Sequence, residues 1–141
     1  MAGIEEFLKR ATEWAQSDLR VDALLLVGSH ARGEATASSD VDLVIITESR
    51  APLLRERGWA IAFGTIERSV EEDWGAVRGL RVWFENGLEV EFGLAEPDWL
   101  AEPLDPGTAE VVRRGYRLLF DRSGSLTIRL RNLVGPGNPQ T

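Results

Sequence analysis

The sequence predicts an α+β fold in which helices flank a central mixed β-sheet, and three patterns support this prediction. Residues 3–17 carry apolar side chains at helical spacing, which indicates an amphipathic helix. The apolar runs 21–27 and 41–46 are short and rich in β-branched residues, as buried strands are. The runs 80–85 and 88–95 flank an Asn-Gly pair, which is a strong indication of a hairpin.

The helix over residues 3–17 has an apolar stripe, which we expect to cover the sheet, and a charged face, which we expect to contact solvent. Its stripe consists of Ile4, Phe7, Leu8, Ala11, Trp14 and Ala15. The strand after it, 21–27, is joined to the strand 41–46 by a short connection. A short connection favours antiparallel neighbours, because parallel strands need a long crossover.

The connection between these two strands carries the residues on which the functional prediction depends. Gly28 ends the first strand, where the lack of a Cβ permits a sharp turn and the close approach of a ligand. Ser29 follows at the start of a short helical turn, whose free backbone N–H groups and hydroxyl suit a phosphate. Asp40 and Asp42 lie two residues apart at the second strand, so their carboxylates face the same side.

The acid pair predicts a metal site. Two carboxylates on one face repel each other unless a cation lies between them. Hard oxygen ligands favour Mg²⁺, which proteins usually hold through one or two carboxylates together with substrate phosphates. In an antiparallel arrangement the end of the first strand lies beside the start of the second. We therefore expect the phosphate-binding turn at Gly28 and Ser29 to lie next to a magnesium site at Asp40 and Asp42.

Three further polar residues of this stretch have less direct roles. His30 is the only histidine of the chain, and a spacer role is favoured over a catalytic one. Arg32 either binds phosphate or pairs with a nearby carboxylate, and both alternatives stay open. Ser39 is a candidate for nucleotide binding, together with Gly28, Ser29 and Arg32. Its expected local role is to cap or form a turn.

The second strand of the hairpin contains two acidic residues on one face. Glu89 and Glu91 alternate with Val90, Phe92 and Leu94, which lie on the opposite face. An acid within an otherwise apolar strand needs an explanation, because burying an unpaired carboxylate is costly. The alternatives are a role in the site and a solvated face of an antiparallel sheet.

Shorter patterns predict the remaining elements. A helix is expected over residues 52–58, followed by a short strand over 60–63 and a helical turn over 70–74. Thr108 is the expected cap of a helix over residues 108–114. The last elements expected are a strand over 116–120, a helix over 125–133 and a flexible tail over 135–141.

Composition restricts the classes of function. The chain of 141 residues is 43% hydrophobic and 28% charged, which is typical of a globular domain with its own core. A formal net charge of −7 disfavours non-specific binding to nucleic acids and membrane surfaces. The absence of cysteine excludes disulfides and zinc–thiolate sites. No apolar run reaches membrane-spanning length and no signal peptide opens the chain, so we expect a cytoplasmic protein.

Gly28-Ser29 followed by Asp40-Val41-Asp42 resembles the motif of the DNA polymerase β-like nucleotidyltransferase superfamily. The fuller string over residues 28–33 and 39–43 is similar to the minimal, stand-alone nucleotidyltransferases and to the antibiotic-modifying adenylyltransferases. The resemblance implies the nucleotidyltransferase fold, as a single domain over residues 1–134.

The resemblance also implies a third acid. The superfamily uses a third carboxylate from a later strand, often in an acid-then-apolar context. Val90-Glu91-Phe92 is similar to that context, so the third acid is assigned to Glu91, with Glu89 as the alternative. The family more usually has aspartate at this position.

The reaction that the resemblance implies is the transfer of a nucleoside monophosphate, AMP from ATP, to an acceptor hydroxyl with release of pyrophosphate. Asp40 and Asp42 would hold two Mg²⁺ ions, and Glu91 would hold the acceptor-side ion and help to deprotonate the hydroxyl. Gly28 and Ser29 would bind the triphosphate. The acceptor is a small molecule or a protein, and its identity, the preferred base and the oligomeric state stay open. The alternative is a non-catalytic nucleotide-binding module or the antitoxin-like partner of a toxin.

Overall fold

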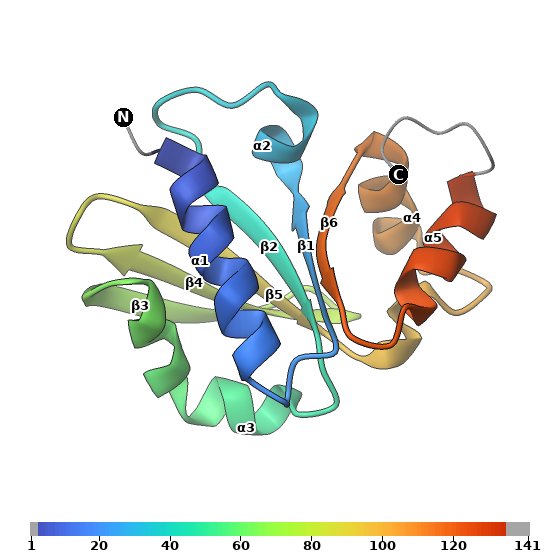
Figure 1. The fold of residues 1–141 in the computed structure, drawn as a ribbon, viewed down its shortest axis with the longest axis horizontal. Helices are drawn as coiled ribbons and strands as arrows, with labels where there is room; N and C mark the ends of the chain where they lie inside the picture. The colour runs from blue at the N-terminus through green and yellow to red at the C-terminus, as the bar shows by residue number, and fades with distance from the viewer. Residues whose placement is uncertain (1–2, 135–141) are drawn as a thin grey trace.

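The N-terminal helix forms where the apolar stripe predicts it. In the computed structural model, which describes residues 3–134, α1 spans Gly3–Ser17 and lies across one face of the sheet (Figure 1). Phe7, Leu8 and Ala11 of its stripe are buried in the same hydrophobic cluster as the sheet residues. The helix predicted over residues 3–17 is confirmed.

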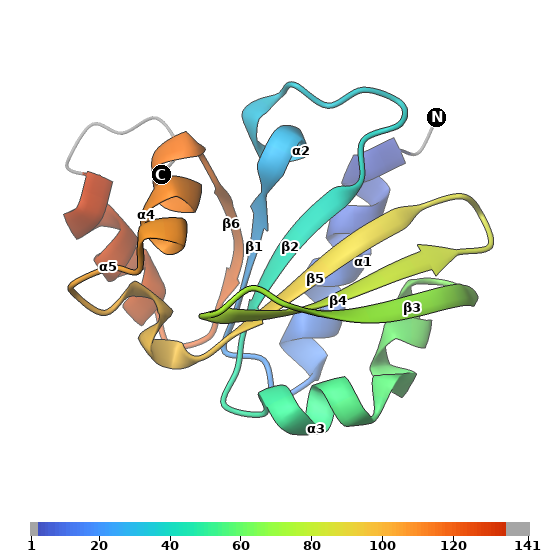
Figure 2. The same ribbon diagram turned by 180° about the vertical axis from the view of Figure 1, so that it is seen from behind.

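The strands of residues 3–134 form a six-stranded sheet in the order β3-β4-β5-β2-β1-β6 (Figures 1 and 2). β1 (Ala23–Val27) and β2 (Val41–Ile46) pair antiparallel, as their short connection predicts. β2 is parallel to its other neighbour, β5 (Glu89–Ala95), and this pair makes the sheet mixed. Antiparallel neighbours complete it, namely β3 (Ile66–Asp73), β4 (Val77–Phe84) and β6 (Arg117–Asp121). The predicted α+β fold is confirmed.

The two faces of the sheet carry separate hydrophobic clusters. On the face under α1, aromatic rings of Trp14, Trp59, Phe63 and Phe92 pack with centroids 5.0–5.3 Å apart. The opposite face is covered on its β6 side by helices of the C-terminal part (Figure 2). These helices are η2 (Pro97–Leu100), α4 (Pro106–Arg114) and α5 (Ser125–Val134). The predicted site residues Asp42 and Glu91 belong to the strands at the centre of this sheet and line the cavity beside α4 on the second face.

The region between β2 and β4 differs from the prediction. α3 spans Arg50–Arg55 and is followed by the 3₁₀ helix η1, Arg57–Phe63, where a strand was expected over 60–63. The strand β3 replaces the helical turn expected over 70–74. Tertiary packing decides both outcomes. η1 buries two rings of the aromatic cluster, and β3 is an exposed edge strand that depends on its ladder with β4 rather than on an apolar pattern.

The cap of α4 also differs from the prediction. Asp105, not Thr108, is the N-cap, and its carboxylate accepts hydrogen bonds from the N–H groups of Gly107 and Thr108 at 3.0 and 3.3 Å. Pro106 occupies the first helical position, where a missing N–H is tolerated, so the cap is the residue before it. Thr108 is buried inside the first turn instead.

Other element ends differ by one to three residues from the prediction, and the largest difference is at β4, which begins at Val77 rather than at residue 80. β1 begins at Ala23 rather than at residue 21, β6 lies one residue later than expected, and α5 ends at Val134. The tail predicted over residues 135–141 lies outside the described residues. None of the helices within residues 3–134 has the length and hydropathy needed to cross a membrane.

Candidate active site

At the turn after β1, the backbone of Gly28 lies close to Asp42 of β2. α2 (Gly28–Arg32) begins directly after β1 and forms the short helical turn that the sequence predicts. Gly28 has a φ of +75°, which other residues rarely adopt. A Cβ at this position would overlap the carboxylate of Asp42, which lies on β2 opposite Val27. The glycine therefore lets Asp42 lie against the start of α2.

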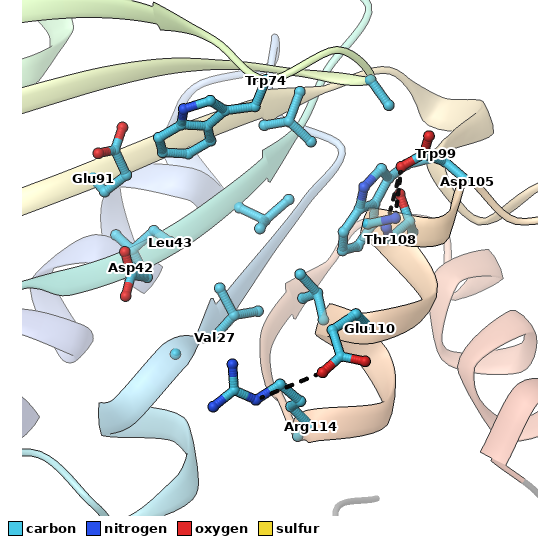
Figure 3. A pocket seen from close by; sticks show the side chains of 18 of the residues that line it. Val27, Asp42, Leu43, Trp74, Glu91, Trp99, Asp105, Thr108, Glu110 and Arg114 are labelled. Atoms are coloured by element: carbon cyan, nitrogen blue, oxygen red, sulfur yellow. Dashed lines mark hydrogen bonds and ion pairs between the residues drawn. The ribbon is translucent and has the colours of Figure 1, made fainter.

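The third acid lies beside Asp42. Asp42 and Glu91 are register partners across the parallel strands β2 and β5, and Figure 3 shows their side chains on these neighbouring strands. The Glu91 side chain is only 3% exposed, whereas that of Glu89 is 34% exposed. Gly79 of β4 leaves room for Glu91, because a Cβ there would lie 2.8 Å from Oε2. Of the two alternatives, Glu91 is the one that the fold buries next to Asp42.

Arg81 of β4 lies among the acids. Its Nη1 is 3.1 Å from Oδ2 of Asp40 and 2.6 Å from Oε2 of Glu89. Its Nη2 is 2.6 Å from Oε1 of Glu91, and its Nε is 3.5 Å from Oε1 of Glu72 on β3. One guanidinium thus joins acids from β3, from β5 and from the residue before β2.

Two of these acids have raised pKa values. The pKa of Glu91 is raised to about 8, first by burial and then by the neighbouring Glu72, although Arg81 acts in the opposite direction. The pKa of Asp42 is raised to about 6, first by burial and then by repulsion from Asp40. Both shifts mean that the ionised carboxylates need more positive charge nearby than Arg81 supplies.

A cavity of about 370 Å³ opens between these acids and α4 (Figure 3). Asp42 and Glu91 lie on one side of it, and Arg114 of α4 lies on the other. Trp74, at the turn between β3 and β4, is 49% exposed and forms part of the wall. Trp99 is buried, and its indole N–H has no hydrogen-bond partner within residues 3–134. The cavity therefore combines carboxylates with aromatic walls.

Comparison with models of protein families shows to which family the chain belongs. A family model described as the nucleotidyltransferase domain matches residues 4–96. The chain belongs to the nucleotidyltransferase domain family. The matched segment includes the turn at Gly28, both members of the Asp40 and Asp42 pair, and the strand that carries Glu91.

Two solved structures share the fold of this nucleotidyltransferase domain. An aminoglycoside 6-adenyltransferase from Bacillus subtilis aligns with a TM-score of 0.54 and 14% identity, over 67% of this chain and 35% of its own. A cytoplasmic RNA terminal U-transferase aligns with a TM-score of 0.52 and 18% identity, over 78% of this chain and 33% of its own. The domain therefore matches about a third of either structure. A comparison with curated proteins found no match.

The acids of the nucleotidyltransferase domain have the chemistry that Mg²⁺ requires. Asp40, Asp42 and Glu91 supply carboxylate oxygens, the hard ligands that this ion prefers. Both carboxylate oxygens of Glu91 are buried, and no donor within residues 3–134 forms a well-aligned hydrogen bond with them. In the same part of the chain, no three acidic or histidine side chains are already arranged to hold an ion. The donor set fits the ion, but Arg81 contacts two of its members.

The other predicted residues of the nucleotidyltransferase domain lie around the acids. Ser29 is in the first turn of α2. Arg32 pairs with Glu34 at 2.8 Å, which is the carboxylate alternative, and it also lines the cavity. Ser39 accepts a backbone hydrogen bond at 2.9 Å within its own turn and lines a separate hollow with His30. The phosphate-binding role of Ser29 and the nucleotide-binding role of Ser39 stay predictions.

Arg81 is the residue of the site that sequence reasoning missed. A two-residue turn at Asn86-Gly87 would place Val82 opposite Glu91 and turn Arg81 to the other face. In the structure the loop is one residue longer, because Phe84 and Leu88 close it with a backbone hydrogen bond of 2.8 Å. Arg81 consequently pairs with Glu91. The role of Arg81 depends on the length of this loop, and an Asn-Gly pair alone does not determine whether the loop has two or three residues.

Proposed function

We propose that this domain transfers a nucleoside monophosphate, AMP from ATP, to an acceptor hydroxyl in a Mg²⁺-dependent reaction that releases pyrophosphate. The observation that carries the proposal is the pairing of Asp42 with Glu91 across β2 and β5, beside the turn at Gly28. The reaction needs an acid pair, an acid from a later strand and a turn that binds phosphate, and the residues proposed for these three parts are neighbours.

Each part has a role in the proposed reaction. Asp40, Asp42 and Glu91 would hold Mg²⁺, two ions in all. When bound, Mg²⁺ neutralises charge on the triphosphate and stabilises the entering and leaving oxygens. Glu91 is the proposed acceptor of the hydroxyl proton: burial raises its pKa to about 8 in the metal-free domain, and its carboxylate would be ionised once Mg²⁺ is bound. The backbone at Gly28 and Ser29 would position the triphosphate.

The cavity beside the acids is the proposed place for the organic part of a reactant. The half-exposed ring of Trp74 offers a flat surface for a nucleobase or for a ring of the acceptor. The indole N–H of Trp99 can donate a hydrogen bond to an oxygen or nitrogen of a ligand in the cavity. Glu110 and Arg114, which pair at 3.9 Å, both line the cavity, so this wall can contact a polar group of either charge.

The test uses ATP labelled at the α-phosphate, together with Mg²⁺ and cell lysate as the source of the acceptor. We expect a labelled product and released pyrophosphate, and the identity of the labelled species names the acceptor. Asp42→Asn should reduce transfer by about a hundredfold or more, because it removes a proposed metal ligand. Asp98→Asn is the matched control, because Asp98 is exposed and does not line the cavity.

The outcomes separate the two candidate functions. ATP binding by calorimetry without any labelled product would favour the non-catalytic nucleotide-binding or antitoxin-like module. Transfer by Asp42→Asn at the rate of the unmodified domain would contradict the metal assignment. Circular dichroism of both variants shows whether a loss of transfer reflects a loss of fold.

A further inference from the structure

Arg81 contacts more acids than a structural ion pair requires. It faces Glu91 across the β4–β5 ladder, and three other carboxylates lie within 3.5 Å of its guanidinium. These carboxylates belong to Asp40, Glu72 and Glu89. The Arg81 side chain is 24% exposed, so its guanidinium reaches solvent on one side. The acids thus share one positive charge, and each of them would repel the others without it.

The contacts of Arg81 overlap with those that a metal ion would make. Asp40 and Glu91 are two of the three acids assigned to Mg²⁺, and each gives one oxygen to Arg81. Oxygens that share an octahedral Mg²⁺ lie about 3 Å apart, because each bond to the ion is about 2.1 Å long. Arg81 instead holds the two oxygens on separate nitrogens, Asp40 on Nη1 and Glu91 on Nη2. The acids gather around this guanidinium, and within residues 3–134 no three of them are arranged to hold an ion.

We propose that Arg81 is a built-in cation that holds the acids together in the metal-free domain and competes with the divalent ion for Asp40 and Glu91. The inference rests on the proposed metal role of these two acids. Arg81 is a positioning residue in this scheme, because it acts on the carboxylates rather than on a reactant.

Glu72 and Glu89 provide a second place for the guanidinium. Neither is assigned to the metal, and their side chains are 31% and 34% exposed, so they lie nearer to solvent than Glu91. Arg81 can therefore release Asp40 and Glu91 by a small outward shift and keep its other two partners. The shift requires no movement of β4, because only the end of a long flexible side chain changes position.

The test measures binding of Mg²⁺ or Mn²⁺ alone, without nucleotide, by calorimetry of the full chain. Arg81→Gln removes the competing charge, so the dissociation constant should fall about tenfold. The melting temperature of the metal-free variant should fall, and Mg²⁺ should raise it more than in the unmodified domain. Arg78→Gln is the control, because Arg78 lies on the same strand and pairs with Glu71 instead. Its metal affinity should change less than about twofold, which measures the effect of net charge alone.

Arg81→Lys covers the case in which Arg81→Gln does not fold. Lysine keeps the charge but contacts fewer oxygens than the fork does, so metal binding should be tighter than in the unmodified domain and weaker than with glutamine. Metal binding that is unchanged or weaker in both Arg81 variants overturns the inference, as does tighter binding of equal size in Arg78→Gln.

The inference and the proposed function can fail separately. If the unmodified domain transfers labelled AMP while both Arg81 variants bind metal no more tightly, the inference is wrong and the proposed function stands. If the Arg81 variants bind metal more tightly but transfer is never detected, the competition stands and the proposed function is wrong.

Discussion

At the scale of single residues, two glycines make room for the carboxylates of the site. A Cβ at Gly28 would overlap Asp42, and a Cβ at Gly79 would lie 2.8 Å from Oε2 of Glu91. The two positions differ in backbone conformation, because only Gly28 has a positive φ. Substitution at Gly28 would therefore strain the backbone as well, whereas a Cβ at Gly79 meets only side chains, with Oε2 of Glu91 the nearest and the ring of Trp74 next at 3.4 Å.

Gly79→Ala should lower transfer about tenfold or more while changing the free energy of unfolding by less than about 1 kcal/mol. The new methyl group meets Oε2 of Glu91 at the end of a flexible side chain, so the carboxylate shifts rather than the backbone of the strand. Steady-state kinetics and urea unfolding measure the two quantities. Gly58→Ala is the control, because a Cβ at Gly58 meets nothing within 4 Å. Equal kcat/KM values for the two variants would contradict the prediction.

At the scale of elements, loop length and helix caps decide which residues reach the site. The loop between β4 and β5 sets the register that pairs Arg81 with Glu91. The cap at Asp105 starts α4, whose side chains line the cavity opposite the acids. The loop and the cap each involve only a few residues. The loop nevertheless sets which face of β4 meets the acids, and the cap sets where α4 begins beside the cavity.

Asp105→Ala should lower the free energy of unfolding by about 1 kcal/mol, because two N–H groups of the first turn lose their acceptor. Asp105→Asn should retain most of that stability, since asparagine caps helices nearly as well as aspartate. Urea unfolding of both variants provides the measurement. Similar destabilisation by alanine and asparagine would show that capping is not the role of Asp105.

At the scale of the whole molecule, the two faces of the sheet have different tasks. The face under α1 holds the aromatic cluster that joins α1, η1 and the central strands. The opposite face carries the acids and the cavity beside α4. A change in the aromatic cluster should therefore affect stability without touching the residues of the site.

Phe63→Ala should lower the free energy of unfolding by about 3–5 kcal/mol, because Phe63 is 1% exposed and its removal leaves a cavity among aromatic rings. Ile61→Ala is the control from the same 3₁₀ helix, because Ile61 is 65% exposed. It should change stability by less than about 0.5 kcal/mol. Denaturant unfolding compares the two, and a loss of equal size would argue against the aromatic cluster as a source of stability.

The parts of the fold that were predictable have local causes. The helix over residues 3–17 and the first two strands follow from the spacing of apolar side chains, which depends on the immediate neighbours only. The edge strand β3 was missed, and Glu72 was missed with it. Most residues of β3 are polar, so the strand has no clear alternation of apolar and polar side chains. It forms because β4 provides backbone hydrogen-bond partners.

The sequence by itself determined the turn at Gly28 and the acid pair at Asp40 and Asp42, because these features lie within one short segment whose geometry is set by adjacent residues. Only the tertiary structure decided that Glu91 rather than Glu89 is buried beside Asp42, and that Arg81 pairs with both Asp40 and Glu91. The physical reason is register. Strands that are distant in sequence are aligned by loop lengths and backbone ladders, and a shift of one residue would turn every side chain to the other face.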